Sequence, residues 1–310
     1  MSSGSREILA YAVETVIGTT PSPFARTSLP FTDSSLDAAV TKEDSATKLD
    51  TRLAQQGTIT AVDYTGDINA EFRYGTYDDL IAANAYNAWV VDTPAVGSDT
   101  ITFGGTTKKT FSILRGYTDV SNYHTFSGMF VNTFNITIPE SGIVTTTFGL
   151  IGLDRVAGSV APTGTVTTPT LTDPFSSVSV TDIQIDGITT AGVACITEFN
   201  FTWDNNSQTQ RCLGDGLAIG NIIETLANGT GSFTMAWSVK GAEMYESQFT
   251  NTTYKLSVKM VDGQGNGYLL TLPKIEITGN LPTGSNTDIL SISYDYRTIE
   301  DAPTLTRTPV

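Results

Sequence analysis

Alternation of apolar and polar residues is the feature that most restricts what this chain can fold into. In "GDINAEF", Ile68, Ala70 and Phe72 fall on one side of an extended backbone, and polar residues fall on the other. Thr-, Val- and Ile-rich segments such as "IVTTTFGLIGL" and "DILSISYDY" follow, separated by turns such as "PESG". A strand of this kind buries one face and exposes the other, as in an antiparallel sheet. The sequence therefore predicts a mainly β protein.

One short segment departs from the strand pattern. "TYDDLIAANAY", residues 76–86, places Leu80, Ile81 and Ala85 on one helical face, and Thr76 can cap the first turn. A single short helix among strands is expected to cover an open end or face of a sheet. We interpret it as a packing element and not as a carrier of chemistry.

The second half of the chain repeats the order of elements in the first half. "NGTGSFTMAWS" has the layout of "YTGDINAEFRY", and "GAEMYESQFTN" follows it as a counterpart of the first helix. A hairpin, a long turn and a last strand then complete both halves, which indicates an internal duplication. The predicted organisation is an N-terminal extended arm (1–35), a first domain (36–155), a Pro-, Gly- and Thr-rich linker (156–175), a second domain (176–299) and a C-terminal tail (300–310). We expect the arm and the tail to have little core of their own.

Composition limits the partners of such a chain. Only 16% of the 310 residues are charged, and the formal net charge is −15 at pH 7. A strongly acidic surface disfavours tight binding of nucleic acid, because phosphate contacts require Lys and Arg. No apolar run reaches the length of a membrane helix, and Arg6, Glu7 and Glu14 surround an N-terminal apolar run too short for a secretory signal. We therefore expect a protein made and kept inside a cell, or carried in a particle assembled there.

The sequence lacks the patterns that mark catalytic or metal sites. His124 has no second histidine to share a metal with, and Cys195 and Cys212 have neither zinc-site spacing nor a disulfide framework. "GDGLAIG" (214–220) and "DGQGNG" (262–267) miss the spacing of a dinucleotide loop and of a calcium loop, so we interpret both as turns. We predict no enzymatic activity and no cofactor.

The ordered series of segments resembles the tail tube proteins of long-tailed siphophages. In chain order the similar segments are "SREILAYAVETVIGTTP", "DTRLAQQGTITAVDYTGDINAEF", "YDDLIAANA", "FSGMFVNTFNITIPESGIVTTTFGLIG", "LGDG", "NGTGSFTMAW", "MYESQF" and "LPKIEITG". They span nearly the whole chain. No single motif is diagnostic, so the specificity of the resemblance lies in the order.

The resemblance implies tube-type β-sandwich or half-barrel domains, each with one flanking short helix, that close into a β-barrel when the chains assemble. Rings of six domains would stack head to tail into a hollow tube that delivers the genome. The duplication favours the version with two fused tube domains, so that three chains give a pseudo-six-fold ring; a hexamer is the alternative. The implied partners are copies of the same chain, the tape measure protein and other tail proteins, and double-stranded DNA that passes without specific binding. The implied location is the virion tail, assembled in the bacterial host cytoplasm, with no membrane partner.

The polar sides of the inner strands are the predicted lumen-facing surface. These candidates are Asp67, Asn69, Glu71, Thr145, Thr147, Thr234, Glu276, Ser291, Ser293 and Asp295. Their apolar neighbours are expected to form the cores: Ile68, Phe72, Phe134, Phe148, Phe233, Trp237, Ile275, Ile277, Ile292 and Tyr294. Lys274 departs from the acidic pattern, and a shift of its strand by one residue would exchange the two faces.

Two other functions remain open on the sequence. An acidic tandem β-sandwich binding module, such as an adhesin or a glycan-binding protein, would normally carry an export signal or a platform of clustered aromatic residues. An acidic hydrolase would need two carboxylates in one pocket, as in glycoside hydrolysis. Acids at alternate strand positions are more simply a solvated face.

Overall fold

The computed structural model describes residues 3–48, 50–190 and 193–310. Strands account for 48% of the chain and helices for 9%, which confirms the prediction of a mainly β protein. The first half contains η1 (Gly4–Arg6), β1 (Glu7–Val13), β2 (Arg26–Ser28), β3 (Asp33–Ser34), β4 (Asp37–Glu43), β5 (Thr58–Glu71), α1 (Asp78–Ala85), β6 (Asp99–Thr102), β7 (Phe111–Tyr117), β8 (Asn122–Ile138), β9 (Thr145–Gly152) and β10 (Asp154–Gly158).

The second half has a similar series of elements. It contains β11 (Val166–Thr167), η2 (Ser177–Ser179), β12 (Val180–Ile185), β13 (Ile188–Thr189), β14 (Ile196–Asp204), β15 (Gln208–Gln210), β16 (Asn221–Ile223), β17 (Asn228–Ala236), α2 (Val239–Ser247), η3 (Gln248–Thr250), β18 (Tyr254–Val261), β19 (Gly267–Gly279), β20 (Ser291–Thr298) and β21 (Thr304–Thr308).

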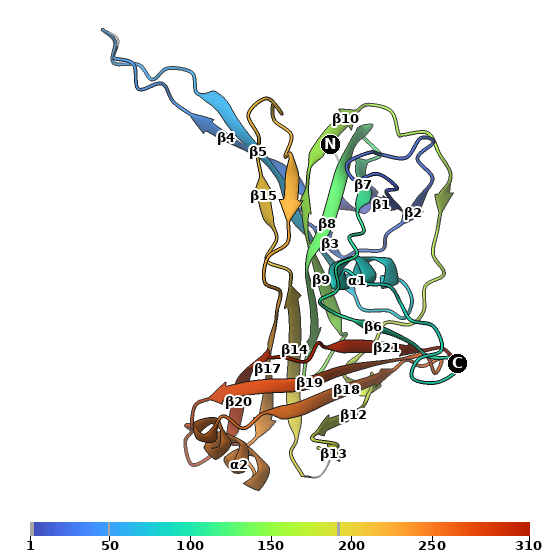
Figure 1. The fold of residues 1–310 in the computed structure, drawn as a ribbon, viewed down its shortest axis with the longest axis vertical. Coiled ribbons are helices and arrows are strands. Elements are labelled where there is room, and N and C mark those ends of the chain that lie inside the picture. The colour runs from blue at the N-terminus through green and yellow to red at the C-terminus, as the bar shows by residue number, and fades with distance from the viewer. Residues whose placement is uncertain (1–2, 49, 191–192) are drawn as a thin grey trace.

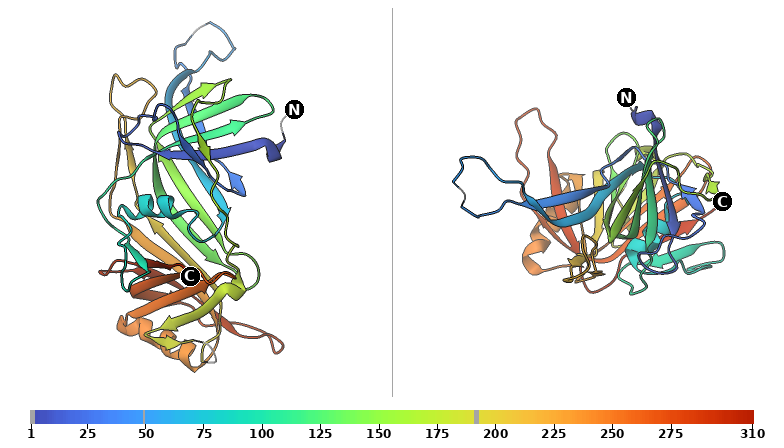
Figure 2. Two further views of the ribbon diagram at one scale, coloured as in Figure 1. Left: turned by 90° about the vertical axis from the view of Figure 1, so that its right-hand side faces the viewer. Right: turned by 90° about the horizontal axis from the view of Figure 1, so that it is seen from above.

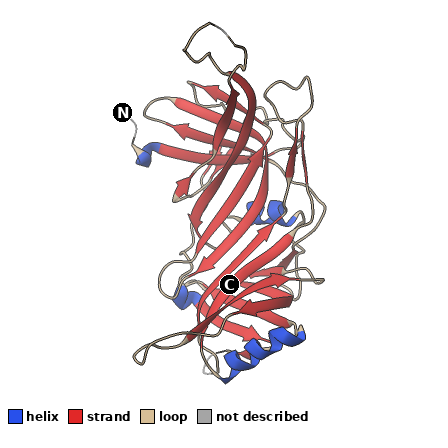
Figure 3. Ribbon diagram, turned by 90° about the vertical axis from the view of Figure 1, so that its left-hand side faces the viewer, coloured by secondary structure: helices blue, strands red, loops and turns tan. Residues whose placement is uncertain are grey.

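One long antiparallel sheet runs through both halves. Its strand order is β4–β5–β9–β8–β14–β17–β20–β19, and each neighbouring pair is antiparallel. The β4–β5 hairpin projects from one end of the molecule, and α2 lies near the other end (Figure 1). The side view in Figure 3 shows the long strands crossing most of the molecule. Within the described residues this sheet is open and does not close into a barrel.

The pairing pattern of the first half recurs in the second. β5 lies between β4 and β9, and β9 pairs with β8; in the second half β17 lies between β14 and β20, and β20 pairs with β19. The outer strands follow the same rule, because β1–β7–β8–β10 has its counterpart in β12–β18–β19–β21. Two segments of slight sequence identity thus share one topology.

The two halves are joined in the sheet itself. Residues 133–138 of β8 pair with residues 199–204 of β14. At a second junction, β6 of the first half pairs with β21 of the second. In Figure 2 the green strands of the first half lie beside the yellow to red strands of the second half. The joint is therefore an extended backbone ladder and not a flexible tether.

The apolar sides of the strands form the core where the alternation predicts it. Nine of the ten predicted core residues are buried: Ile68, Phe72, Phe134, Phe148, Phe233, Ile275, Ile277, Ile292 and Tyr294. Trp237 is half-buried and packs against the same cluster. The rings of Phe134 and Phe148 stack across β8 and β9 with centroids 5.3 Å apart. A period of two residues was enough to identify these faces.

Three segments that the sequence assigns to an arm, a linker and a tail contribute to the packed structure. Within residues 1–35, β1 pairs with β7 along its whole length and buries Leu9. Within 156–175, Phe175 is buried against Phe72, with ring centroids 5.6 Å apart. In the tail, β21 pairs with β19 and buries Leu305. The expectation that arm and tail have little core is therefore wrong, because each supplies a paired strand with a buried side chain.

The first helix begins later than predicted. Helix α1 starts at Asp78, with Tyr77 in the capping position and no side-chain cap. The hydroxyl of Thr76 donates instead to the carbonyl of Tyr74 at 3.5 Å, so the predicted Thr76 cap is wrong. Asp78 and Asp79 lie in the first turn, where carboxylates interact favourably with the helix dipole.

A cluster of charged and hydroxyl groups ties α1 to the second half. The Arg307 guanidinium donates to Asp99 Oδ2 at 2.7 Å and also contacts Asp78, whose carboxylate accepts a bond from the Tyr268 hydroxyl. Burial raises the pKa of Asp78, although bonds from Tyr268 and Arg307 act in the opposite direction. The hydrogen bond from Arg307 lowers the pKa of Asp99.

Replacing Arg307 is expected to destabilise the fold in a pH-dependent way. R307Q should cost about 2 to 3 kcal/mol of unfolding free energy at pH 7, because an ionised Asp78 loses its counter-charge. Asp99 stabilises the fold above its ordinary pKa of 3.8, and this contribution is lost as the pH falls. Without Arg307 the pKa of Asp78 rises further. Ionising the Asp78 carboxyl in the folded protein then reduces the unfolding free energy more as the pH rises.

The measurement is urea unfolding of both proteins at pH 7 and near pH 3.5. The effect of R307Q should be larger at pH 7. The matched control is R297Q, since Arg297 also pairs with a carboxylate, on Glu276, but its side chain is 65% exposed. R297Q should change stability by less than about 1 kcal/mol. Equal effects of the two substitutions would contradict the assignment.

Candidate functional site

A continuous polar face lies opposite the core of the long sheet. Cross-strand partners share a face, so the registers align polar side chains in rows across seven strands, β5–β9–β8–β14–β17–β20–β19. One row consists of Asn69, Thr147, Asn135, Thr202, Thr230, Arg297 and Glu276. The next consists of Glu71, Thr145, Thr137, Asn200, Ser232, Asp295 and Thr278. We call this surface the polar face.

The ten residues predicted from the sequence all lie on the polar face and are exposed or half-exposed. The register brings some of them into contact: Thr147 Oγ1 donates to Asn69 Oδ1 at 2.7 Å. Thr234 lies opposite Ser293 on the neighbouring strand. Ile275 and Ile277 are buried, so Glu276 is on the polar side and the register shift raised by Lys274 does not occur. Lys274 pairs with Glu300.

The central strands of this face carry polar residues that were not among the predicted positions. Asn135 and Thr137 on β8, and Asn200 and Thr202 on β14, supply its middle rows. The Asn135 amide donates to the Thr202 hydroxyl at 2.8 Å, across the joint between the halves. Their signal was present as the alternation in "FNITI" and "EFNFTWD". The pairing of β8 with β14, which makes them neighbours, has no local signal.

Charges on the polar face are mostly acidic and in part paired. Glu71 bonds Arg73 at 2.5 Å, and Glu276 accepts a bond from Arg297 Nε at 2.7 Å. Asp67 and Asp295 are exposed. Thr, Ser and Asn fill most other positions, so the surface offers hydroxyl and amide groups and few cations. Such a surface binds polyanions weakly, since phosphate contacts depend on Lys and Arg.

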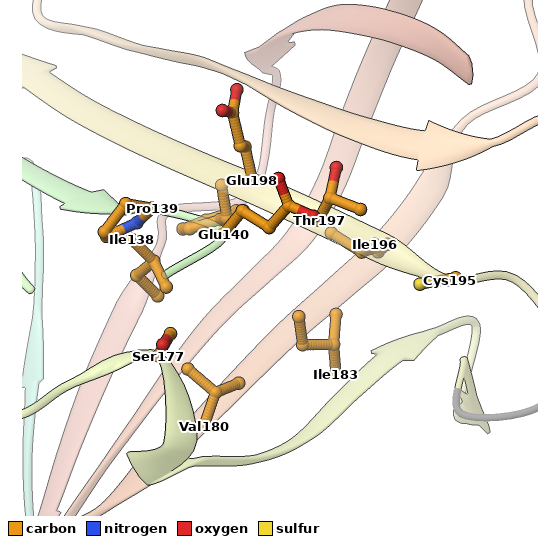
Figure 4. Close-up of a pocket in the computed structure, with 11 residues that line it drawn as sticks. Ile138, Pro139, Glu140, Ser177, Val180, Ile183, Cys195, Ile196, Thr197 and Glu198 are labelled. Atoms are coloured by element: carbon orange, nitrogen blue, oxygen red, sulfur yellow. The ribbon is translucent and has the colours of Figure 1, made fainter. Parts of the chain in front are cut away.

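A small cavity lies where the end of β8 approaches the starts of β12 and β14. Its volume is about 240 Å³, and Ile138, Val180 and Ile183 contribute apolar wall. Glu198 also borders it, and Figure 4 shows this side chain pointing away from Val180 and Ile183. Glu140 borders the same cavity, so two carboxylates are present, as glycoside hydrolysis requires. The Glu198 side chain is directed away from the rest of the lining, however, and not across the cavity as one member of a hydrolytic pair would be. We assign this cavity no catalytic role.

The remaining candidate residues have structural surroundings. His124 Nδ1 lies 2.7 Å from Arg155 Nη1, and burial together with this cation lowers the pKa of His124. Cys195 and Cys212 are both exposed and free. Among the described residues, no cluster of three or more His, Cys, Asp or Glu side chains could hold a metal. None of the described helices has the length and hydropathy needed to cross a membrane.

An open antiparallel sheet with one apolar face, one polar face and unpaired edges is typical of a subunit that completes its structure in an assembly. The fold and the polar face thus define a structural assembly protein. A family model described as phage tail tube protein matches residues 4–298. The chain belongs to this family and is a structural component of the phage tail. The predicted family is confirmed, and the fusion of two tube domains stays a prediction. No curated protein matches the chain.

Proposed function

We propose that this chain is the major subunit of a hollow tail tube through which the phage genome is delivered. Copies assemble into rings whose long sheets join around a central channel, and rings stack head to tail. The polar face supports this most directly, because it is continuous over seven strands of a sheet whose outer strands, β4 and β19, leave backbone edges open in the described chain. Joining sheets removes such edges, and barrels of many strands enclose an aqueous channel.

The polar face would line the channel. The ten candidates, Asp67 to Asp295, would then face the passing DNA, together with Asn135, Thr137, Asn200 and Thr202 from the central strands. Hydroxyl, amide and carboxylate groups hold phosphates weakly, so DNA would slide without specific binding. The tape measure protein would occupy the same channel before the genome does.

Each ring would contain three chains, each with two tube domains. The repeated pairing pattern supports this arrangement, because β4–β5–β9–β8 and β14–β17–β20–β19 are equivalent units. We place the domains at 36–155 and 176–299, with β1 and β21 as additional strands from the arm and the tail. Three chains of eight such strands then give a pseudo-six-fold ring. Assembly would take place in the cytoplasm of the bacterial host.

Negative-stain electron microscopy of the purified chain tests the proposal. We expect rings or long hollow tubes, with class averages showing three-fold symmetry and six similar lobes. A measured ring mass equal to six chains would show that the ring is a hexamer and not a trimer. A compact monomer at all concentrations would contradict the proposal and favour a tandem β-sandwich binding module.

A further inference from the structure

The β8–β14 pairing, which joins the two halves of one chain, predicts how neighbouring chains pair with each other. Because the halves share one topology, their registers give residue-by-residue counterparts. Ile68 on β5 and Phe233 on β17 are both buried at the same position of the repeat. Their partners on the next strand, Phe148 and Tyr294, are therefore counterparts. Gly66 and Gly231, each two residues before this position, support the alignment, because at both a Cβ would collide with the backbone of the neighbouring segment.

The strands at the joint, β8 and β14, also have counterparts in the other half. Phe134 pairs with Phe148, and Gly279 pairs with Tyr294, so Gly279 is the counterpart of Phe134. On the other side, Ser34 pairs with Ile68 and Phe199 pairs with Phe233. Ser34, at the end of β3, thus corresponds to Phe199. Ala38, four residues later in β4, corresponds to Trp203.

Phe134 and Trp203 are direct partners in the joint between β8 and β14. Their counterparts, Gly279 and Ala38, lie at opposite ends of the long sheet and have no strand on their outer side in the described chain. We propose that β19 of one copy pairs antiparallel with β4 of a second copy, with Gly279 opposite Ala38. The neighbouring pairs are then Asn280 with Asp37, and Thr278 with Ala39.

Backbone geometry at the two edges supports this register. The amide of Ala38 donates to Asp37 Oδ1 at 2.7 Å, and the amide of Gly279 donates to Gln248 Oε1 at 3.2 Å. Both amides therefore point away from their own ladders, and side-chain oxygens occupy the place of a partner strand. Two residues that face each other as a hydrogen-bonded pair exchange two N–H···O bonds. In the proposed pairing the outward amides of Ala38 and Gly279 face each other in such a pair.

The surroundings of the two helices agree with the same mapping. The end of α1 is covered by the segment after β14, where Asn205 Nδ2 donates to the carbonyl of Asn84 at 2.8 Å. The counterpart of this segment follows Ala39 and begins at Val40, which is 51% exposed. Within the described chain the counterpart helix has no such cover: Phe249, just after the end of α2, is 69% exposed, and Val239 at its start is 79% exposed. The second copy would cover this apolar surface with its β4 segment.

Cysteine cross-linking tests the register, in a chain where Cys195 and Cys212 are first replaced by Ser. Asp37 and Asn280 would form a non-hydrogen-bonded pair with Cα atoms about 4.5 Å apart, a distance compatible with a disulfide. D37C/N280C should oxidise to species of more than one chain. The largest covalent species reports the number of chains in a ring. The in-chain control is N135C/T202C, at the counterpart positions, which should give a monomeric cross-link.

The mis-registered control uses the same edge. A39C/N280C moves one cysteine by two residues along β4 and should give at least about tenfold less intermolecular product. A39C/T278C restores the register and should cross-link again. Assembled tubes without either registered cross-link, or with equal product from the shifted pair, would overturn this pairing and leave the tube function intact. A wild-type chain that never assembles would overturn the tube function, on which this inference rests.

A second variant needs no cysteine. Val40 lies two residues beyond Ala38, so its amide also points outward and would donate to the carbonyl of Ile277, as the Asn205 amide donates to the Asn132 carbonyl at 3.0 Å. V40P removes this amide while sparing the ladder to β5. We expect a folded chain, by circular dichroism, whose assembly falls at least about tenfold relative to V40A. Equal assembly of the two variants would overturn the inference.

Discussion

Phages whose tail tube carries D67K/D295K are expected to lose infectivity by at least about tenfold while their tubes still assemble. Both side chains are exposed on the polar face, Asp67 on β5 and Asp295 on β20. The long sheet places them on strands from different halves, so the substitutions would distribute cations around the proposed channel. Each added ammonium group can bind a phosphate, and every ring repeats the contacts, so the moving DNA would be slowed.

These positions are better suited to the test than Glu71. The Glu71 carboxylate bonds Arg73, so a lysine there would place two cations together and perturb the strand. The control D67N/D295N removes the same charges without adding cations and should remain close to the wild type. The measurements are plaque-forming units per purified tail and the rate of DNA release in vitro. Full infectivity of a phage with intact D67K/D295K tubes would contradict the assignment of the polar face to the channel.

The F148A substitution should cost about 3 to 5 kcal/mol of unfolding free energy. Phe148 is fully buried, stacks on Phe134 and packs against Tyr77 with ring centroids 5.7 Å apart. It therefore connects the long sheet to the segment that enters α1. Truncation leaves a cavity that neighbours on three elements cannot fill together. Urea unfolding of the full chain measures the loss.

The control for F148A is T147S, one residue earlier on the opposite face of β9. It keeps a hydroxyl for the bond to Asn69 and should change the unfolding free energy by less than about 0.5 kcal/mol. A loss below about 1 kcal/mol in F148A would show that Phe148 is not part of a rigid core. A large loss in both variants would mean that the two faces of β9 are not distinct.

The local sequence pattern predicted the buried and exposed faces of the strands correctly, but it did not predict where elements begin or which segments join the sheets. The alternation around Ile68 and Tyr294 identified buried and exposed sides correctly, because side chains of a strand alternate with a period of two. The helix start was misplaced because the Thr76 hydroxyl bonds the carbonyl of Tyr74 and no amide of the first turn, a choice that the residue type does not determine. The arm and tail were misjudged because the strands that pair with them are distant in the sequence, as β1 and β7 show.

The polar face likewise has a part that the sequence predicts and a part that it does not. The sequence identified polar positions on β5, β9, β17, β19 and β20, since each follows from the alternation within one strand. It could not place Asn135 beside Thr202, because the two are separated by 67 residues and only the β8–β14 ladder brings them together.

By itself, the sequence determined the class of the fold, the family and the side of each strand that meets water. Those properties depend on residue type and on spacing over a few residues, and such short-range information survives in any arrangement of the strands. Tertiary structure alone decided that the halves share one sheet and which backbone edges are left unpaired. Backbone hydrogen bonds are chemically the same at every residue, and the alternation determines only which face of a strand is buried, so neither identifies the distant strand with which it pairs.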